Sequence, residues 1–295
     1  MSLFGPKLLK RFHYLSLISR RAGKSPFLAG ARQKLPGGGT ELTGYRDYAP
    51  GDDFRQIYWT LCARRDEVLT KVFEGDADQH LYLLLDCSPS MKMGTPPKFQ
   101  LARQVAAMLG YAALMNLDRL GVIAFGDGPV AELPALRHHS RLPRLLRFLE
   151  ELTPQSGRTN LARTAETFVG RYQRHGPVVV LSDLYDPDGF QRGFDILRCH
   201  GYEPRLVQVH DPREDDPGLL GDVELLDVET QEVRDATITE RAARRYCKLV
   251  AEFRQSVRGY CAQHGIPCLQ VACDASENEV LLRVLGVRRL AAESK

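Results

Sequence analysis

LYLLLDCSPSM, residues Leu81 to Met91, is an aliphatic run that ends in Asp86 and opens into a loop with two serines. A continuous aliphatic run is typical of a strand that is buried on both faces of a parallel sheet. In open α/β sheets, ligands bind just beyond the carboxyl ends of such strands. Asp86, Ser88 and Ser90 therefore stand where a binding site is expected, and the run itself predicts the centre of an α/β fold.

Two further segments bring oxygen donors toward the same edge of this sheet. Residues 177–183, PVVVLSD, predict a second buried strand that ends at Asp183, and the polar loop 156–160 contains Thr159. Carboxylate and hydroxyl oxygens are the hard donors that Mg²⁺, Mn²⁺ and Ca²⁺ prefer. Serine and threonine are also ordinary turn and helix-capping residues, so the prediction of a metal site depends on the conjunction of the three segments.

The order of these motifs resembles a known metal site. D-x-S-x-S, then a threonine loop, then an aspartate at the end of a strand is similar to the metal-ion-dependent adhesion site (MIDAS) of von Willebrand factor A domains. The resemblance implies that Ser88, Ser90 and Thr159 contact Mg²⁺, or Mn²⁺ or Ca²⁺, and that Asp86 and Asp183 act directly or through water. Magnesium commonly keeps water-filled positions, so a carboxylate from a partner protein can complete the shell.

A second motif precedes the first strand. Residues 46–59, RDYAPGDDFRQIYW, followed by Ala63 and Arg64, resemble the segment ahead of the A-like domain in the bacterial domain of unknown function 58 (DUF58) family. That family usually has an acidic residue before the tryptophan, where this chain has Tyr58. The resemblance implies a MoxR-type AAA+ ATPase as partner and an unknown client protein that the assembly matures or remodels.

The charged turn in this second motif has two interpretations. In the first, its acids form ion pairs with nearby arginines, and Trp59, the single tryptophan of the chain, packs in a core between the leader and the sheet. In the second, Arg46, Asp52, Asp53, Arg55 and Trp59 form a partner-binding surface. The first is favoured, and the second is retained as a candidate site.

Composition predicts a soluble, cytoplasmic protein. The chain has 295 residues, of which 43% are hydrophobic and 26% charged, which suffices for one large core. Its seven cysteines include no C-x-x-C pair, which disfavours a zinc site or a disulfide framework and fits a reducing compartment. The sequence has no run of about 18 apolar residues, so we expect no membrane-spanning helix. Many DUF58 relatives carry membrane segments ahead of the motif, and we expect this chain to be a short, soluble form.

The amino-terminal segment is strongly basic. Residues 1–40 contain eight lysines and arginines and no acid, and Leu8, Phe12 and Leu15 follow helical spacing between Pro6 and Arg20. We favour packing of this helix on the domain over peripheral contact with an anionic membrane or an acidic protein, and we predict no specific nucleic-acid partner. Residues 36–39, PGGG, predict a hinge.

The remaining chain alternates helices and strands, as a doubly wound, mainly parallel sheet with an antiparallel edge strand requires. We expect a basic extension and family motif over residues 1–78 and a von Willebrand A-like, Rossmann-like domain over 79–290. Helices are expected at 98–117, 141–152, 160–175, 188–200, 239–263 and 277–285, and strands at 119–125, 129–133, 204–210 and 267–273. A β-ribbon is expected at 222–238, either covering a sheet edge or a crossover connection or binding a partner.

Motifs for common catalytic classes are absent from the sequence. It has no H-E-x-x-H zinc site, no G-x-x-x-x-G-K-[ST] phosphate loop and no G-x-S-x-G serine nucleophile. We therefore predict a non-catalytic, metal-dependent interaction adaptor. Two alternatives remain: a metal-free scaffold that binds through the amino-terminal extension or the ribbon, and a metal-dependent phosphoester hydrolase built on Asp86 and Asp183.

Overall fold

The computed structural model describes residues 25–28, 36–49, 53–65, 67–74, 79–155, 157–215, 218, 220–229 and 232–284. These residues divide into two compact units. The smaller unit consists of the described residues between 31 and 79, and the larger unit contains all the others. Residues 25–28, which we expected in the first domain, group with the larger unit. None of the described helices is long and apolar enough to cross a membrane.

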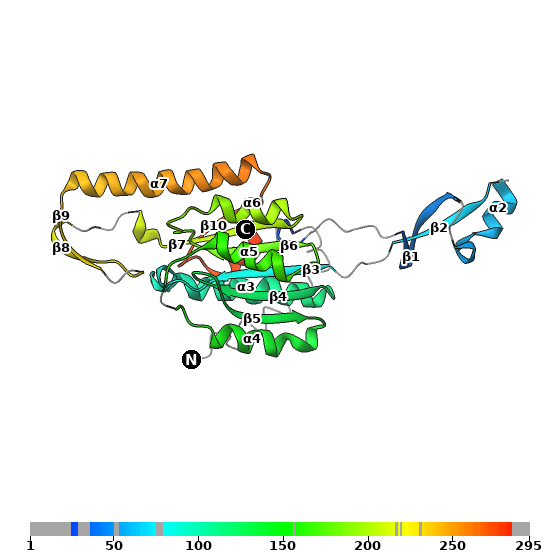
Figure 1. The fold of residues 1–295 in the computed structure, drawn as a ribbon, viewed down its shortest axis with the longest axis horizontal. Coiled ribbons are helices and arrows are strands. Elements are labelled where there is room, and N and C mark those ends of the chain that lie inside the picture. Colours follow the sequence, from blue (N-terminus) through cyan, green and yellow to red (C-terminus); the bar gives the residue numbers. More distant parts are fainter. Residues whose placement is uncertain are drawn as a thin grey trace, which may run out of the picture. The chain divides into compact units, whose positions relative to one another are not determined.

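A six-stranded sheet forms the centre of the larger unit (Figure 1). Its strand order is β10-β7-β6-β3-β4-β5, and every pairing is parallel except that of β5 with β4. The predicted α/β class with a mainly parallel sheet is therefore confirmed, and β5 forms an antiparallel edge. The strands are β3 (His80–Asp86), β4 (Arg119–Phe125), β5 (Pro129–Leu136), β6 (Pro177–Ser182), β7 (Glu203–His210) and β10 (Cys268–Ala272).

Helices cover both faces of the sheet, because successive side chains of a strand point to opposite faces. In β3, Leu81, Leu83 and Leu85 belong to one core, whereas Tyr82 and Leu84 belong to a second. The first core includes α3 (Lys98–Met115), α4 (Leu142–Glu151) and α8 (Glu277–Val284), and the second includes α5 (Leu161–Arg171), α6 (Gln191–Cys199) and α7 (Glu240–Gln263). The aliphatic run of β3 is therefore buried from both sides.

Part of the amino-terminal leader packs on the first core. The hydroxyl of Ser25 donates a hydrogen bond of 2.7 Å to the carbonyl oxygen of Val284, at the end of α8. Phe27 and Leu28 are buried in the same core. The predicted helix over residues 6–20 and all eight basic residues of the leader lie outside the described residues.

The smaller unit is built on an antiparallel pair. Strand β1 (Pro36–Asp47) pairs with β2 (Leu69–Glu74), and the turn η1 (Phe54–Gln56) and the helix α2 (Trp59–Arg65) lie between them in the chain. The prediction of a hinge at residues 36–39 is wrong, because these residues begin β1. The pairing shifts register between Pro36 and Glu41, and such irregularities tolerate glycine.

The tryptophan of this unit does not pack in a core within the unit. Trp59 is 66% exposed and Phe54 is 65% exposed, whereas Ile57 is buried. The packing of Trp59 between the leader and the sheet stays a prediction. The ring of Tyr58, in the place of the family's acid, stacks on Tyr45 with 5.3 Å between the ring centroids.

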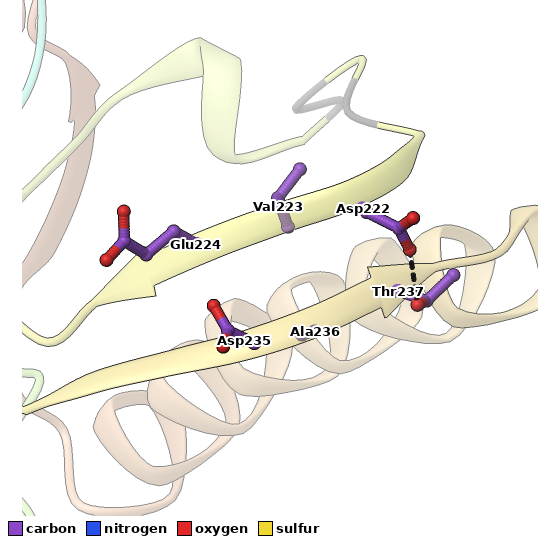
Figure 2. Close-up of a pocket in the computed structure, with 6 residues that line it drawn as sticks. All are labelled: Asp222, Val223, Glu224, Asp235, Ala236 and Thr237. Carbon is purple, nitrogen blue, oxygen red and sulfur yellow. Dashed lines mark hydrogen bonds between the residues drawn. The ribbon is translucent and has the colours of Figure 1, made fainter.

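The predicted ribbon forms a sheet of its own. Strand β8 (Gly221–Leu226) pairs antiparallel with β9 (Val233–Ile238), and among the described strands neither pairs with an edge of the large sheet. The predicted two-stranded ribbon is therefore confirmed, and its role as a cover for a sheet edge or crossover stays a prediction. Figure 2 shows a shallow hollow along its middle, where the hydroxyl of Thr237 donates a 2.6 Å hydrogen bond to Asp222. The hollow is lined by Asp222, Val223, Glu224, Asp235, Ala236 and Thr237.

Strand β6 requires a glycine immediately before it. A Cβ atom on Gly176 would lie 2.1 Å from the carbonyl oxygen of His80, a backbone atom that has no side-chain freedom to move away. We expect Gly176→Ala to lower the free energy of unfolding by ~1–3 kcal/mol, as overpacking does. Gly170→Ala is the matched control, because nothing lies within 4 Å of its Cβ position in α5. Urea denaturation of both variants checks this, and equal stabilities would contradict it.

Candidate functional site

Two neighbouring strands bring their terminal acids together at the carboxyl edge of the sheet. Strands β3 and β6 are parallel neighbours, with Leu85 opposite Leu181. Asp86 therefore ends one strand, Ser182 ends the other, and Asp183 follows it. The hydroxyl of Ser182 donates a 2.5 Å hydrogen bond to Oδ2 of Asp86. All three of these polar residues are buried. The predicted proximity of the two aspartates is therefore a feature of the structure.

The loop after β3 folds its serines back onto Asp86. The backbone N–H of Ser88 donates a 2.8 Å hydrogen bond to Oδ1 of Asp86. The hydroxyl oxygens of Ser88 and Ser90 lie 2.9 Å apart, at the start of the short helix η2 (Pro89–Lys92). Both serines are buried although they belong to a loop. The alternation of the motif thus places one carboxylate and two hydroxyls in a single turn of chain.

Thr159 comes from the loop before α5. This loop is tied to the ends of two strands, because the N–H of Gln155 donates to the carbonyl oxygen of Cys87 at 2.8 Å and the N–H of Asn160 to that of Gly126 at 2.9 Å. Asn160 caps α5, so its side chain has a structural role. Thr159 is 2% exposed, and its hydroxyl has no hydrogen-bond partner within the described part of the chain. This buried hydroxyl is available to a ligand.

The pKa of Asp86 is raised. Burial and, after it, the negative charge of Asp183 raise this pKa from 3.8 to about 7, against the hydrogen bonds from Ser182 and Ser88. Two carboxylates that share a desolvated site cannot both ionise without cost. A divalent cation between them would relieve that cost.

One positive charge already lies at the site, and sequence reasoning missed it. Nζ of Lys98 lies 2.7 Å from Oδ2 of Asp183 and 3.0 Å from Oε1 of Glu214, and the lysine side chain is 1% exposed. The two carboxylates outweigh burial and hold the pKa of Lys98 above its ordinary value. The sequence placed Lys98 at the first position of a helix after the serine loop, but a lysine there is typical of a solvent-exposed end.

A second layer of charges ties α7 to the site. Arg254 of α7 contacts Oε2 of Glu214 at 3.4 Å and Oδ1 of Asp215 at 2.5 Å. The hydroxyl of Tyr185 donates to the same Glu214 at 2.9 Å. Glu214 therefore connects Lys98, and through it Asp183, to the long helix.

The turn of the ribbon contains a third carboxylate, Glu229, whose pKa responds to the charges of the site. The charges of Asp183 and Arg158 and the backbone N–H of Thr159 all act on this pKa. Burial, followed by the charge of Asp183, raises the pKa of Glu229. No sequence signal marked this residue, because it lies in an ordinary turn far from the other segments.

The donor atoms at this edge fit a hard cation such as Mg²⁺, bound by hydroxyl as well as carboxylate oxygens. The described residues hold no cluster of three or more histidines, cysteines, aspartates or glutamates suited to a metal ion. The set at this edge instead combines two carboxylates with three hydroxyls, and the hydroxyl of Thr159 is buried with no partner in the part of the chain that the structure describes. Lys98 engages Oδ2 of Asp183, while Oδ1 accepts the N–H of Tyr185 at 3.1 Å.

The other candidate residues lie in the smaller unit. Arg46, Asp53, Arg55 and Trp59 are all exposed, and Oδ1 of Asp53 accepts the N–H of Arg55 at 2.9 Å as the cap of η1. Asp52 lies outside the described residues. Partner binding by this surface stays a prediction.

Comparison with known proteins gives a family match and several relatives. The model of the family described as "Protein of unknown function DUF58" matches residues 44–256. "Uncharacterized protein Rv1480" of Mycobacterium tuberculosis is 26% identical over 262 residues, which cover 88% of this chain and 82% of that protein. "Uncharacterized protein YeaD" of Bacillus subtilis is 32% identical over 81 residues, 28% of this chain and 19% of that protein.

Among solved structures, two matches have the same coverage. The conserved hypothetical protein BatB from Bacteroides thetaiotaomicron is 13% identical with a TM-score of 0.44, over 70% of this chain and 96% of that chain. An aerotolerance-related membrane protein from Bacteroides fragilis is 14% identical with a TM-score of 0.44, over the same shares of the two chains.

Proposed function

We propose that this chain, which belongs to the family of proteins of unknown function DUF58, is a non-catalytic adaptor that binds other proteins through a divalent metal ion. One observation carries the proposal: the hydroxyl of Thr159 is buried and has no hydrogen-bond partner among the described residues, in a loop whose main chain is bonded to Cys87, the residue after Asp86. In this interpretation the larger unit is a von Willebrand A-like domain, and the five residues Asp86, Ser88, Ser90, Thr159 and Asp183 form a MIDAS.

Different residues of the chain would supply the neutral and the charged oxygens that hold the ion. Ser88, Ser90 and Thr159 would supply neutral oxygens, and Asp86, fixed by Ser182 and by the N–H of Ser88, would supply charge directly or through water. Binding would favour loss of the Asp86 proton, because metal ligands act in their deprotonated form. Mg²⁺, Mn²⁺ or Ca²⁺ would supply a position open to a carboxylate of the partner.

The serine pair gives the direct test of this assignment. We expect Ser88→Ala combined with Ser90→Ala to weaken Mg²⁺ binding by at least ~10-fold, since the loss of even indirect contacts to a metal costs that much. The fold should persist because both hydroxyls lie in a loop. Calorimetric titration with MgCl₂ measures the affinity. Ser256→Ala is the control, because that hydroxyl bonds only within α7 at 2.7 Å among the described contacts, and unchanged affinity in the double variant would exclude these ligands.

The partner we propose is a MoxR-type AAA+ ATPase, with which the chain would mature or remodel a client protein. The support is the family resemblance of residues 46–59. The test is co-purification from cells of the source organism, with and without a chelator, using the wild type and the double serine variant. We expect the ATPase to co-purify with the wild type in the absence of chelator and to be missing from the other three samples. Retention of the ATPase in all four samples would contradict a metal-dependent contact.

A metal-free scaffold is the second candidate, and the 2.7 Å contact of Lys98 with Asp183 favours it. In that case the lysine is the cation of the site, and binding would use the ribbon or the amino-terminal extension. Magnesium titration separates the two candidates, because a scaffold shows no heat of binding. A third, less supported candidate is a metal-dependent phosphoester hydrolase, which turnover of p-nitrophenyl phosphate would reveal.

A further inference from the structure

One face of the ribbon combines acids with exposed apolar side chains. Directly opposite residues of an antiparallel pair share a face, and so do residues two apart in one strand. The face in question, the acidic ribbon face, has three such pairs, namely Asp222 with Thr237, Glu224 with Asp235, and Leu226 with Val233. Leu226 and Val233 are 55% and 54% exposed, so this face is open to solvent. Figure 2 shows its three acids along the two strands.

Two of these acids oppose each other without a counter-charge. Glu224 of β8 is paired directly with Asp235 of β9, and like charges at opposite positions of two strands repel. The single basic residue of the two strands, Arg234, forms its ion pair with Glu232 at 2.7 Å. Within the described part of the chain, no ion pair reaches Glu224 or Asp235. Positive charge from outside the ribbon would therefore stabilise this face.

The amino-terminal half of α7 has the opposite charge. Arg241, Arg245 and Lys248 follow one another at intervals of four and three residues, so they form a basic stripe along one face of the helix. Leu249 borders this stripe and is 53% exposed. None of the described residues of α7 before Val250 is buried. Neither arginine of the stripe forms an ion pair with a described residue, so both charges are open to a partner.

The acidic ribbon face and the basic stripe match in spacing as well as in charge. Asp222 and Glu224 are about 6.6 Å apart along their strand. Arg241 and Arg245 are about 6 Å apart along their helix. Each row continues in chain order to an exposed leucine. Among the described residues no ion pair joins the ribbon to α7, so this match is not used within one chain.

We propose that the partner of these two surfaces is a second copy of this chain, with the acidic ribbon face of one copy packed on the basic stripe of the other. Every copy carries both surfaces, and they are consecutive in the chain, so two copies related by a two-fold axis can form both contacts at once. The inference goes beyond the proposed function, because it requires no ion at Asp86 and Asp183. High salt should weaken the dimer, because exposed charges are screened.

Charge reversal on either surface tests the proposal. The ribbon variant carries Glu224→Lys and Asp235→Lys, and the helix variant carries Arg241→Glu and Arg245→Glu. All four positions are exposed, and the ribbon variant keeps a like-charge pair, so both should fold. We expect the full-length wild type to form a dimer at low salt in sedimentation equilibrium, and the dissociation constant of each variant to rise at least ~10-fold, because attraction is replaced by repulsion.

A matched control separates this effect from a general change of net charge. Arg144→Glu with Arg147→Glu makes the same charge change as the helix variant, at two exposed positions of α4. We expect this control to dimerise like the wild type. A control that dissociates as much as the helix variant would contradict a contact through the basic stripe.

Mixing the ribbon variant with the helix variant gives the sharpest measurement. In the mixed dimer a basic ribbon meets an acidic helix and an acidic ribbon meets a basic helix, so both contacts regain opposite charges. We expect the mixture to associate at least ~10-fold more tightly than either variant alone, a recovery that damage to the fold could not produce. A mixture that associates no better than its components would overturn the proposal. A wild type that stays monomeric at low salt would also overturn it, and would leave the basic stripe to a different, acidic protein.

Discussion

Lys98→Met lowers the stability of the metal-free protein by ~3–5 kcal/mol, the expected cost of leaving a buried charge without its partner. The substitution keeps the length and apolar stem of the side chain, so the loss of stability measures the effect of removing the ammonium charge. Lys98 bridges Asp183 and Glu214, and without it both carboxylates face each other in a buried site. Urea denaturation in the presence of EDTA measures the change.

The same substitution should strengthen metal binding. The ammonium group holds Oδ2 of Asp183 and repels any cation that approaches, so its removal should raise the Mg²⁺ affinity and return part of the lost stability. Lys248→Met is the control, because the Lys248–Glu252 pair is exposed, with 76% and 57% of the side chains accessible, and such pairs contribute under ~1 kcal/mol. A Lys98→Met protein as stable as the control, or one that binds Mg²⁺ less tightly, would contradict the assigned role.

Asp86→Asn should remove a pH dependence that the wild type shows without metal. The folded-state pKa of Asp86 is about 7, above its ordinary value of 3.8. Between these values the folded protein holds a proton that the unfolded chain has released, so stability falls as pH rises from about 4 to about 7. The stability of the asparagine variant should therefore change less with pH over this range. At pH 8 the variant should be more stable than the metal-free wild type.

We expect Mg²⁺ to reverse the order of stability of the wild type and Asp86→Asn. Free Mg²⁺ at about 100 times its Kd adds ~2.7 kcal/mol to the wild type, whereas Asp86→Asn should gain little because it lacks the buried charge. Melting curves at pH 5 and pH 8, with EDTA or with MgCl₂, cover the four conditions. Asp274→Asn, at an exposed position, should follow the wild type throughout. A metal-free wild type that becomes more stable from pH 5 to pH 8 relative to Asp86→Asn would argue against the raised pKa.

The sheet and the serine loop could be predicted because their signals are local. A continuous aliphatic run identifies a doubly buried strand, and helical spacing of Leu101, Val105, Leu109 and Ala112 identified the core face of α3, where all four are buried. The alternation of Asp86, Ser88 and Ser90 places all three oxygens within one turn. Chain order then brings Asp183 to the same edge through parallel strand pairing.

The missed features depend on contacts between distant segments. Lys98 meets Glu214 across 116 positions of sequence, and nothing at a helix start distinguishes a buried lysine from an exposed one. Residues 36–39 contain the local signals of a hinge, but pairing with β2 makes them a strand, as tertiary context often overrides local preference.

The attachment of the Thr159 loop through main-chain atoms has a consequence for protein engineering. Both of its anchors, from Gln155 to Cys87 and from Asn160 to Gly126, join an amide to a carbonyl oxygen, and neither uses a side chain. The exposed side chains of Gln155 and Arg158 can therefore be exchanged while the hydroxyl keeps its place, whereas Gly157, with a φ of +125°, and Asn160, the cap of α5, should be kept. This makes the segment a suitable acceptor for a transplanted metal-binding or fluorescent residue next to the aspartates, with the strands serving as an unchanged frame.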